Sequence, residues 1–302
     1  MALMSADEEA KALKAGIAIV LLGVLMFACV DTLNKVLGQS HSIAQILWVR
    51  FLIFVPIALV LSYRRHGGLR WGGLTWRSQR PLLQAARAAL LVIEMGFFVA
   101  ALKYLPLADV QAIAASAPLM VVALSVPFLG EKVGWRRWSA VTVGFTGVLI
   151  IVRPGFESMS TGTILTLIGT AMWAAYQILL RIVGRYDPAP TTALWTAVIG
   201  LAMTSMVVPF HWTPPSPLGW FLLLLIGILG AAGHTVFMKA FTLAPASALQ
   251  PFTYTQLVLV TFLGWLVFGD LPDGWTVAGA SLIVAAGLYS IYRARLRAAS
   301  GD

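Results

Sequence analysis

Long apolar stretches recur along almost the whole chain, and they constrain its fold more than any other feature. Each is about as long as the roughly 20 residues that an α-helix needs to cross the hydrocarbon core of a bilayer. Only 11% of the 302 residues are charged, against roughly 25% in soluble domains, so most of the surface is expected to face lipid. The sequence therefore predicts an all-α polytopic membrane protein with about ten transmembrane helices, at residues 14–37, 43–63, 81–104, 107–129, 135–152, 161–182, 191–210, 218–243, 245–268 and 275–292.

The basic residues lie mainly in the short segments between alternate stretches. If the N-terminus is cytoplasmic, the segments on that side hold about fifteen Lys and Arg residues, and the opposite side holds Lys35, Lys103 and Arg153. Since cytoplasmic loops of membrane proteins carry the excess of Lys and Arg, both termini are expected on the cytoplasmic side of the inner or plasma membrane. Topology thus accounts for the net charge of +9, and no nucleic-acid partner is expected.

The two halves of the chain resemble each other. Pro106 and Pro245 match at an offset of 139 residues, and so do Gly130-Glu131 and Gly269-Asp270. Small residues of the first stretch recur 146 residues later: Gly16, Gly23, Met26, Ala28 and Gly38 match Gly162, Gly169, Met172, Ala174 and Gly184. A register held through several helices indicates a duplication, with one five-helix repeat at 12–154 and the other at 160–293.

An odd number of helices in each repeat has a topological consequence. The second copy must enter the membrane upside down relative to the first, so the two repeats are inverted. Inverted repeats are typical of secondary transporters, in which exchange of the two repeats' conformations interconverts the outward-open and inward-open states.

Sequence motifs in each half carry a resemblance to a known family. A proline opens a helix, the following span ends in Gly-Glu, and the last helix ends in Arg-Pro: Leu105-Pro106, Leu129-Gly130-Glu131-Lys132, Gly144, Gly147 and Arg153-Pro154. The pattern resembles the EamA repeat of the drug/metabolite transporter superfamily; the second copy has Gly269-Asp270 in place of Gly-Glu. The chain looks most similar to the YddG-type branch, which implies export of amino acids, especially aromatic ones, and related small metabolites.

Two ionisable residues lie near the middle of apolar stretches, where a charge is costly and usually functional. At the offset of 139, Glu94 of the third stretch falls opposite Gly233, one residue from His234 of the eighth. The two side chains are therefore expected to approach each other at the membrane centre. They are candidates for substrate binding and for coupling to protons; the alternative is a structural hydrogen bond between helices.

Further polar and aromatic residues are candidates for the binding site. Aromatic rings in a cavity stack on an apolar substrate and amides orient its polar groups, although core packing is the commoner role of such rings. The substrate-binding candidates are Trp173, Tyr176, Gln177, Tyr254, Gln111 and Gln250, of which the last two are repeat mates near the helix-opening prolines.

Arginines and prolines inside the spans form a second group of candidates. Arg50 can meet Asp31 or a substrate carboxylate, whereas Arg87 is expected to extend its guanidinium to the membrane surface. Pro118 and Pro251 interrupt their spans and are predicted as gating hinges.

The predicted function is secondary transport of a small molecule by alternating access, with no cofactor and no metal. The alternatives are transport of other drug-like or metabolite substrates within the same superfamily, or an intramembrane enzyme or a channel. An enzyme would need a metal cluster, a nucleophile set or paired acids, and neither these nor a Walker A motif stands out in the sequence.

Overall fold

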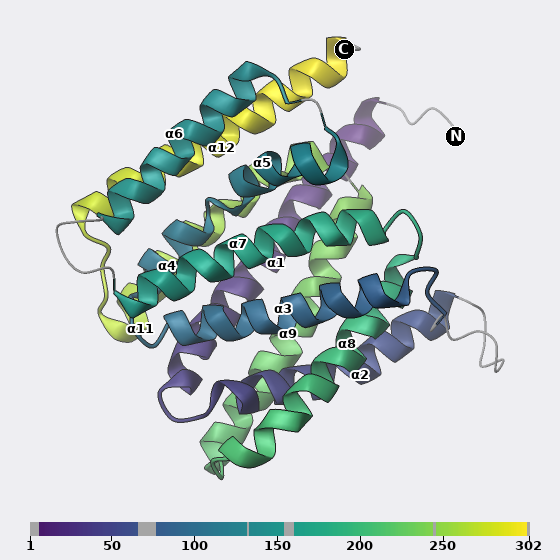
Figure 1. Ribbon diagram of the computed structural model, residues 1–302, viewed down its shortest axis with the longest axis vertical. Coiled ribbons are helices and arrows are strands. Elements are labelled where there is room, and N and C mark those ends of the chain that lie inside the picture. The colour runs from purple at the N-terminus through teal and green to yellow at the C-terminus, as the bar shows by residue number, and fades with distance from the viewer. Residues whose placement is uncertain (1–5, 66–76, 132, 154–159, 244–245, 301–302) are drawn as a thin grey trace.

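The computed structural model describes residues 6–65, 77–131, 133–153, 160–243 and 246–300, and the elements of this part are all helical (Figure 1). The first half comprises α1 (Ala6–Gly38), α2 (Ile43–Arg65), α3 (Pro81–Ala101), α4 (Leu107–Ala114), α5 (Ala117–Leu129) and α6 (Trp135–Val152). The second half comprises α7 (Thr161–Val183), α8 (Ala189–Val207), the 3-10 turn η1 (Val208–His211), α9 (Pro217–Leu243), α10 (Ala246–Thr253), α11 (Thr255–Phe268) and α12 (Gly274–Ser300).

The predicted all-α polytopic class is confirmed. Within the described residues, nine segments are long and apolar enough to cross a membrane. The fifth predicted stretch, α6, is not one of them, because Arg136 and Arg137 lie in its first turn. It nevertheless forms a full-length helix that packs along α12.

Helix packing is unchanged when the two halves of the chain are exchanged. The first helix of each half packs on the third helix of the other, as α1 on α9 and α7 on α3. The second helices, α2 and α8, pack on each other, and so do the last helices, α6 and α12. This is the arrangement expected of two repeats related by a two-fold axis.

The self-paired helices run antiparallel. Trp48 near the start of α2 donates a hydrogen bond to Ser205 near the end of α8, at 2.9 Å. At the other pair, Arg153 at the end of α6 forms an ion pair with Asp273 at the start of α12. Since equivalent helices of the two halves point in opposite directions, the repeats are inverted with respect to each other.

The fourth helix of each half is broken at an equivalent position. The first break separates α4 from α5, and the second separates α10 from α11. At each break a hydroxyl group donates a hydrogen bond to the backbone carbonyl three residues earlier: Ser116 donates to Ile113 O at 2.7 Å, and Thr255 donates to Phe252 O at 2.6 Å. These two hydroxyls are repeat mates at the offset of 139, so both breaks belong to the fold rather than to one half.

The Gly-Glu and Gly-Asp motifs end these broken helices. Gly130 and Gly269 take left-handed backbone conformations with φ of 67° and 74°, which residues other than glycine rarely adopt. The chain therefore turns sharply, and the acidic residue that follows is presented at the end of the bundle.

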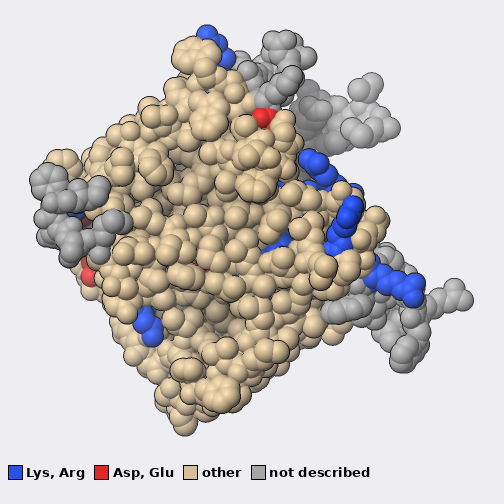
Figure 2. Space-filling view, in the orientation of Figure 1, with Lys and Arg blue, Asp and Glu red and all other residues tan. Residues whose placement is uncertain are grey.

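Lys and Arg side chains gather at one end of the molecule. Figure 1 shows both termini towards the upper right. On the face drawn in Figure 2, most basic side chains lie at the top and along the right-hand edge, the same end. The distribution agrees with cytoplasmic termini, which stay a prediction.

Candidate substrate-binding site

Four ionisable side chains from four helices converge inside the bundle. They are Asp31 of α1, Arg50 of α2, Glu94 of α3 and His234 of α9. Arg50 is close enough to interact electrostatically with both carboxylates and with the histidine ring. The carboxylates are 9% and 7% exposed. A buried charge is stable only when it is paired, so this cluster is a candidate functional site.

Asp31 is held by one amide from each broken helix. Gln111 of α4 and Gln256 of α11 each donate a hydrogen bond to the same carboxylate oxygen, at 2.9 Å. An amide is a neutral donor, so it positions the carboxylate without cancelling its charge. Asp31 thereby links the first helix to the broken helices of both halves.

A small pocket opens beside the cluster, with a volume of about 50 Å³. Its lining includes Arg50, Phe54, Met95, Gly230 and His234. Gly230 lies beside Arg50, and a Cβ atom there would be in ordinary van der Waals contact with the guanidinium, at 3.7 Å. A volume of this size holds only a few water molecules, so the helices must separate to admit a metabolite.

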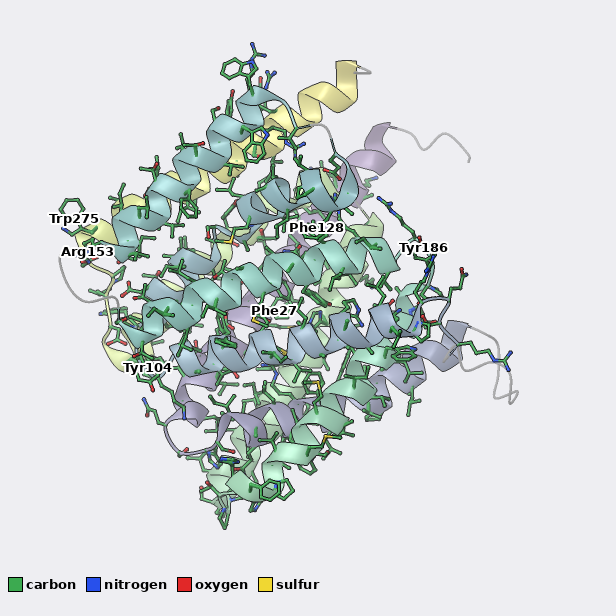
Figure 3. All side chains as sticks on the ribbon, in the orientation of Figure 1. Phe27, Tyr104, Phe128, Arg153, Tyr186 and Trp275 are labelled. Carbon is green, nitrogen blue, oxygen red and sulfur yellow. The ribbon has the colours of Figure 1, made fainter. Side chains whose placement is uncertain are left out.

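Aromatic rings form one wall of this region. Phe27 packs edge-on against His234, with ring centroids 5.3 Å apart, and Phe54 lies 6.4 Å from the same ring. Figure 3 places Phe27 near the middle of the bundle, away from both ends.

The predicted pair Glu94 and His234 does occupy the same region. Among the interactions of the described residues, however, the two side chains do not contact each other, and each interacts with Arg50 instead. Gln111, a predicted substrate-binding residue, donates a hydrogen bond to a carboxylate of the protein. The substrate-binding and proton-coupling roles of these residues stay predictions.

Other predicted residues lie outside the cluster. Trp173 and Tyr176 stack on each other at 5.2 Å, and Tyr176 accepts a hydrogen bond from Arg87. Tyr254 lies at the second break with its hydroxyl buried against α12, where a Cβ at Gly287 would collide with it.

The remaining candidates are placed only in part. Gln177 is half-buried on α7. Gln250 lies in α10, but its side chain is outside those that the structure describes. The predicted hinges lie beside the breaks, with Pro118 in the first turn of α5 and Pro251 inside α10. Their role in gating stays a prediction.

The prediction that Arg87 reaches the membrane surface is wrong. Its side chain is fully buried between α3, α7 and α8. It donates hydrogen bonds to Thr192 O at 3.0 Å, Thr196 Oγ1 at 2.7 Å and Tyr176 Oη at 3.3 Å. These partners replace the water that the guanidinium would have sought at the interface.

The sequence does not predict Asp31 as a binding residue, and it does not predict the contact between Asp31 and Gln256. Asp31 was considered only as a partner for Arg50, although an acid in the first apolar stretch is itself the signal of a functional site. The closeness of Gln256 to Asp31 carries no sequence signal, because Gln256 has no glutamine at its repeat-related position.

Two ion pairs lie at equivalent positions of the two repeats, one at each end of the bundle. Lys35 of α1 meets Asp270 at 2.6 Å, and Arg181 of α7 meets Glu131 at 2.9 Å. The basic partners are repeat mates, and so are the acidic ones, which follow the two left-handed glycines. Each pair joins the first helix of one half to the end of the broken helix of the other.

Comparison with known families agrees with this geometry. The EamA-like transporter family matches the chain twice, over residues 14–153 and 160–292. The chain belongs to the EamA-like transporter family. It is therefore a membrane transporter of the drug/metabolite transporter superfamily by descent, and each half carries one EamA unit.

EamA-like relatives that match this chain transport different metabolites. An S-adenosylmethionine uptake transporter of Rickettsia felis is 26% identical over 289 residues, covering 95% of each chain. A riboflavin transporter of Vibrio cholerae is 29% identical over 232 residues, covering 76% of this chain and 77% of its own. The pseudopaline exporter CntI of Pseudomonas aeruginosa is 25% identical over 280 residues, covering 91% and 95%.

A solved crystal structure shares the EamA-like fold. It superposes with a TM-score of 0.62 at 19% identity, covering 95% of this chain and 98% of the other, which bears on the fold alone. None of these comparisons bears out the narrower resemblance to aromatic amino-acid exporters, so that substrate class stays a prediction.

Proposed function

We propose that this EamA-like protein transports a small zwitterionic metabolite with an additional positive charge, of which S-adenosylmethionine is the type. The charge content of the central cluster carries the proposal. The protein offers one guanidinium, Arg50, and two carboxylates, Asp31 and Glu94. S-adenosylmethionine offers the complement, which is one carboxylate, one ammonium group and one sulfonium group.

Pairing these charges satisfies a strict energetic requirement. Buried ions are tolerated when each meets an opposite charge, and an unpaired ion inside the membrane is expensive. The substrate carboxylate would bind Arg50, and the two cationic groups would bind Asp31 and Glu94. Gln111 and Gln256 keep Asp31 in place for this contact. The rings of Phe27 and Phe54 beside the cluster suit a flat heterocycle.

Other substrates fit the cluster less well. Riboflavin has no charged group to pair with these ions. Phenylalanine, or another amino acid of the predicted class, would leave one carboxylate without a cation, and that carboxylate would then take a proton. Amino-acid export coupled to protons through Glu94 and His234 is therefore the second candidate, and the direction of transport differs even among the matching relatives.

Alternating access would use the broken helices and the terminal ion pairs. One equivalent pair lies at each end of the bundle, Lys35 with Asp270 and Arg181 with Glu131. Opening one end would separate the pair there while the other stays closed. The breaks at Ser116 and Thr255 supply the positions about which α5 and α11 can tilt.

Flux in proteoliposomes tests the proposal. Labelled S-adenosylmethionine, riboflavin and phenylalanine are offered separately, in both directions and with or without a pH gradient. We expect saturable flux of S-adenosylmethionine, reduced by about tenfold or more in Asp31→Asn and in Glu94→Gln, since each loses a charge-assisted contact. Asp187→Asn is the matched control, because Asp187 lies between α7 and α8, outside both the cluster and the terminal ion pairs.

The remaining outcomes discriminate among the candidates. Flux of phenylalanine alone, driven by the pH gradient and lost in Glu94→Gln or His234→Ala, would replace the proposal by proton-coupled amino-acid transport. Flux of riboflavin alone would show that the charged cluster does not select the substrate. Equal loss in Asp187→Asn would show that the effect of the acidic variants is not local to the cluster.

A further inference from the structure

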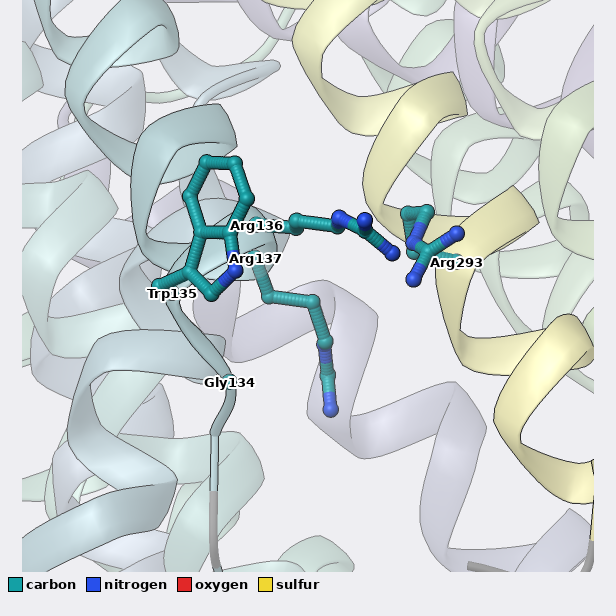
Figure 4. Close-up of a pocket in the computed structure, with 5 residues that line it drawn as sticks. All are labelled: Gly134, Trp135, Arg136, Arg137 and Arg293. Carbon is teal, nitrogen blue, oxygen red and sulfur yellow. The ribbon is translucent and has the colours of Figure 1, made fainter.

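A second pocket lies outside the central cluster, between the first turn of α6 and the last turns of α12. Its volume is about 100 Å³, and its lining consists of Gly134, Trp135, Arg136, Arg137 and Arg293. Figure 4 shows the side chains of Arg136 and Arg293 extending toward each other from the two helices. Three guanidinium groups therefore line one small space.

This arrangement of charges favours the binding of an anion. Within the described part of the chain, neither Arg136 nor Arg293 forms an ion pair with an acidic residue. Arg136 lies over the ring of Trp135, 5.4 Å from its centroid. Gly134 precedes α6 with no side chain to cap it, so the first backbone N–H groups of the helix add further positive potential. Like charges that face each other are unfavourable unless a counter-ion joins them.

The repeat supplies an internal comparison for this pocket. Trp275 is the repeat mate of Trp135, and Arg153 is the repeat mate of Arg293. Figure 3 shows Arg153 and Trp275 together at the opposite end of the α6–α12 pair. There an acid is built into the chain: Asp273 accepts the backbone N–H of Thr276 at 2.8 Å and pairs with Arg153.

The contacts at that opposite corner lower the pKa of its acid. Burial alone would raise the pKa of the Asp273 carboxyl, but the contacts from Thr276 and Arg153 hold this pKa below its usual value. At the Gly134 corner the equivalent N-cap position has no carboxylate, while the number of arginines is larger. No acidic side chain is among the described residues that line the pocket at the Gly134 corner.

We propose that the pocket formed by Gly134, Arg136 and Arg293 binds the phosphate group of an anionic phospholipid. A phosphate can accept hydrogen bonds from two guanidinium groups and from the helix N-terminus at once, as Asp273 does on a smaller scale. Exposed aromatic residues lie within about one helical turn of the lining residues along α6 and α12, namely Trp135, Trp138, Tyr289 and Tyr292. Such rings mark the membrane–water interface, the depth at which lipid phosphates lie.

Lipid titration of the purified full-length protein tests the site. Delipidated protein in detergent is titrated with phosphatidylglycerol, with phosphatidylcholine and with inorganic phosphate, and bound lipid is counted by native mass spectrometry. We expect phosphatidylglycerol to bind preferentially, and Arg136→Gln and Arg293→Gln each to weaken it about fivefold. Arg80→Gln is the matched control, because Arg80 is exposed at the same end but lies over Tyr186 and outside the pocket.

A gain-of-function variant makes the test sharper. Gly134→Asp would supply the acid that the opposite corner contains, and its backbone there is already extended, with φ −73° and ψ 159°. We expect this variant to resist heat in the absence of lipid as well as the wild type does with phosphatidylglycerol, and to bind that lipid weakly.

Three results would overturn the proposal. Unchanged binding in Arg136→Gln and Arg293→Gln would show that the pocket is not the site. Equal weakening in Arg80→Gln would show diffuse attraction to the basic end alone. Inorganic phosphate that displaces phosphatidylglycerol at equal concentration would keep the phosphate chemistry but assign the site to a free anion rather than a lipid.

Discussion

Replacing Gly147 by alanine tests whether α6 and α12 are as closely packed as the fold requires. A Cβ atom at this position would lie 2.7 Å from the carbonyl oxygen of Gly279 and 2.8 Å from Cγ1 of Ile283. Unstrained contacts of carbon atoms begin near 3.5 Å, and a backbone oxygen cannot turn aside as a side chain can. The helices must therefore separate by several tenths of an ångström along their shared face.

The expected cost follows from measured effects of overpacking. Inserting a methyl group into a well-packed site destabilises a protein by about 1–3 kcal/mol. Alanine also favours the helix over glycine by about 0.5–1 kcal/mol, which offsets part of this cost. Gly96→Ala gains the helical preference alone, because no atom lies within 4 Å of its added Cβ. The two variants should therefore differ by about 1–3 kcal/mol in the free energy of unfolding.

Reversible unfolding in mixed detergent micelles, titrated with a denaturing detergent and followed by circular dichroism, measures this difference. Gly96→Ala should unfold at a higher denaturant fraction than the wild type, and Gly147→Ala at a lower one. If both variants shift in the same direction by the same amount, α6 and α12 do not pack through their glycines, and the antiparallel arrangement of the last helices would have to be revised.

Two further predictions concern the ends of the bundle. Although burial alone would raise the pKa of Asp187, hydrogen bonds that it accepts, including one from Ser78, hold the pKa below its usual value. The carboxylate therefore stabilises the folded state at pH values above the pKa that Asp187 has in the unfolded chain, and this contribution is lost as the pH falls through the pKa of the folded state. Asp187→Asn should therefore flatten the acid side of a curve of unfolding free energy against pH. An unchanged curve would contradict this reasoning. The second prediction concerns a cross-link between Lys35→Cys and Asp270→Cys, made with a short bifunctional thiol reagent in a Cys29→Ser background. The cross-link should stop transport if the end of the bundle closed by this pair must open. Full flux in the cross-linked protein would show that the pair stays closed throughout the cycle.

The central cluster illustrates what a sequence can and cannot place in a membrane bundle. Glu94 and His234 stand out because an ionisable residue in an apolar stretch is rare, and the repeat register puts them at similar depth. The register does not give the partner of either side chain. That depends on how far each helix is rotated about its axis, and a span that is apolar all round carries little periodic signal for its rotation. Arg50 thus emerged as the common partner only in the folded chain.

By itself, the sequence determined the apolar stretches and their approximate bounds, because the bilayer requires a minimum apolar length and the backbone must satisfy its own hydrogen bonds. It also determined that the repeats are inverted, because each holds an odd number of spans. Only the tertiary structure decided that Arg87 is fully buried and that Gln111 and Gln256 meet at Asp31. It also decided that one corner of the α6–α12 pair contains an acid, whereas none is among the described residues that line the pocket at the other corner. These facts rest on contacts between residues far apart in the chain, whose partners are chosen by the crossing of whole helices rather than by local sequence.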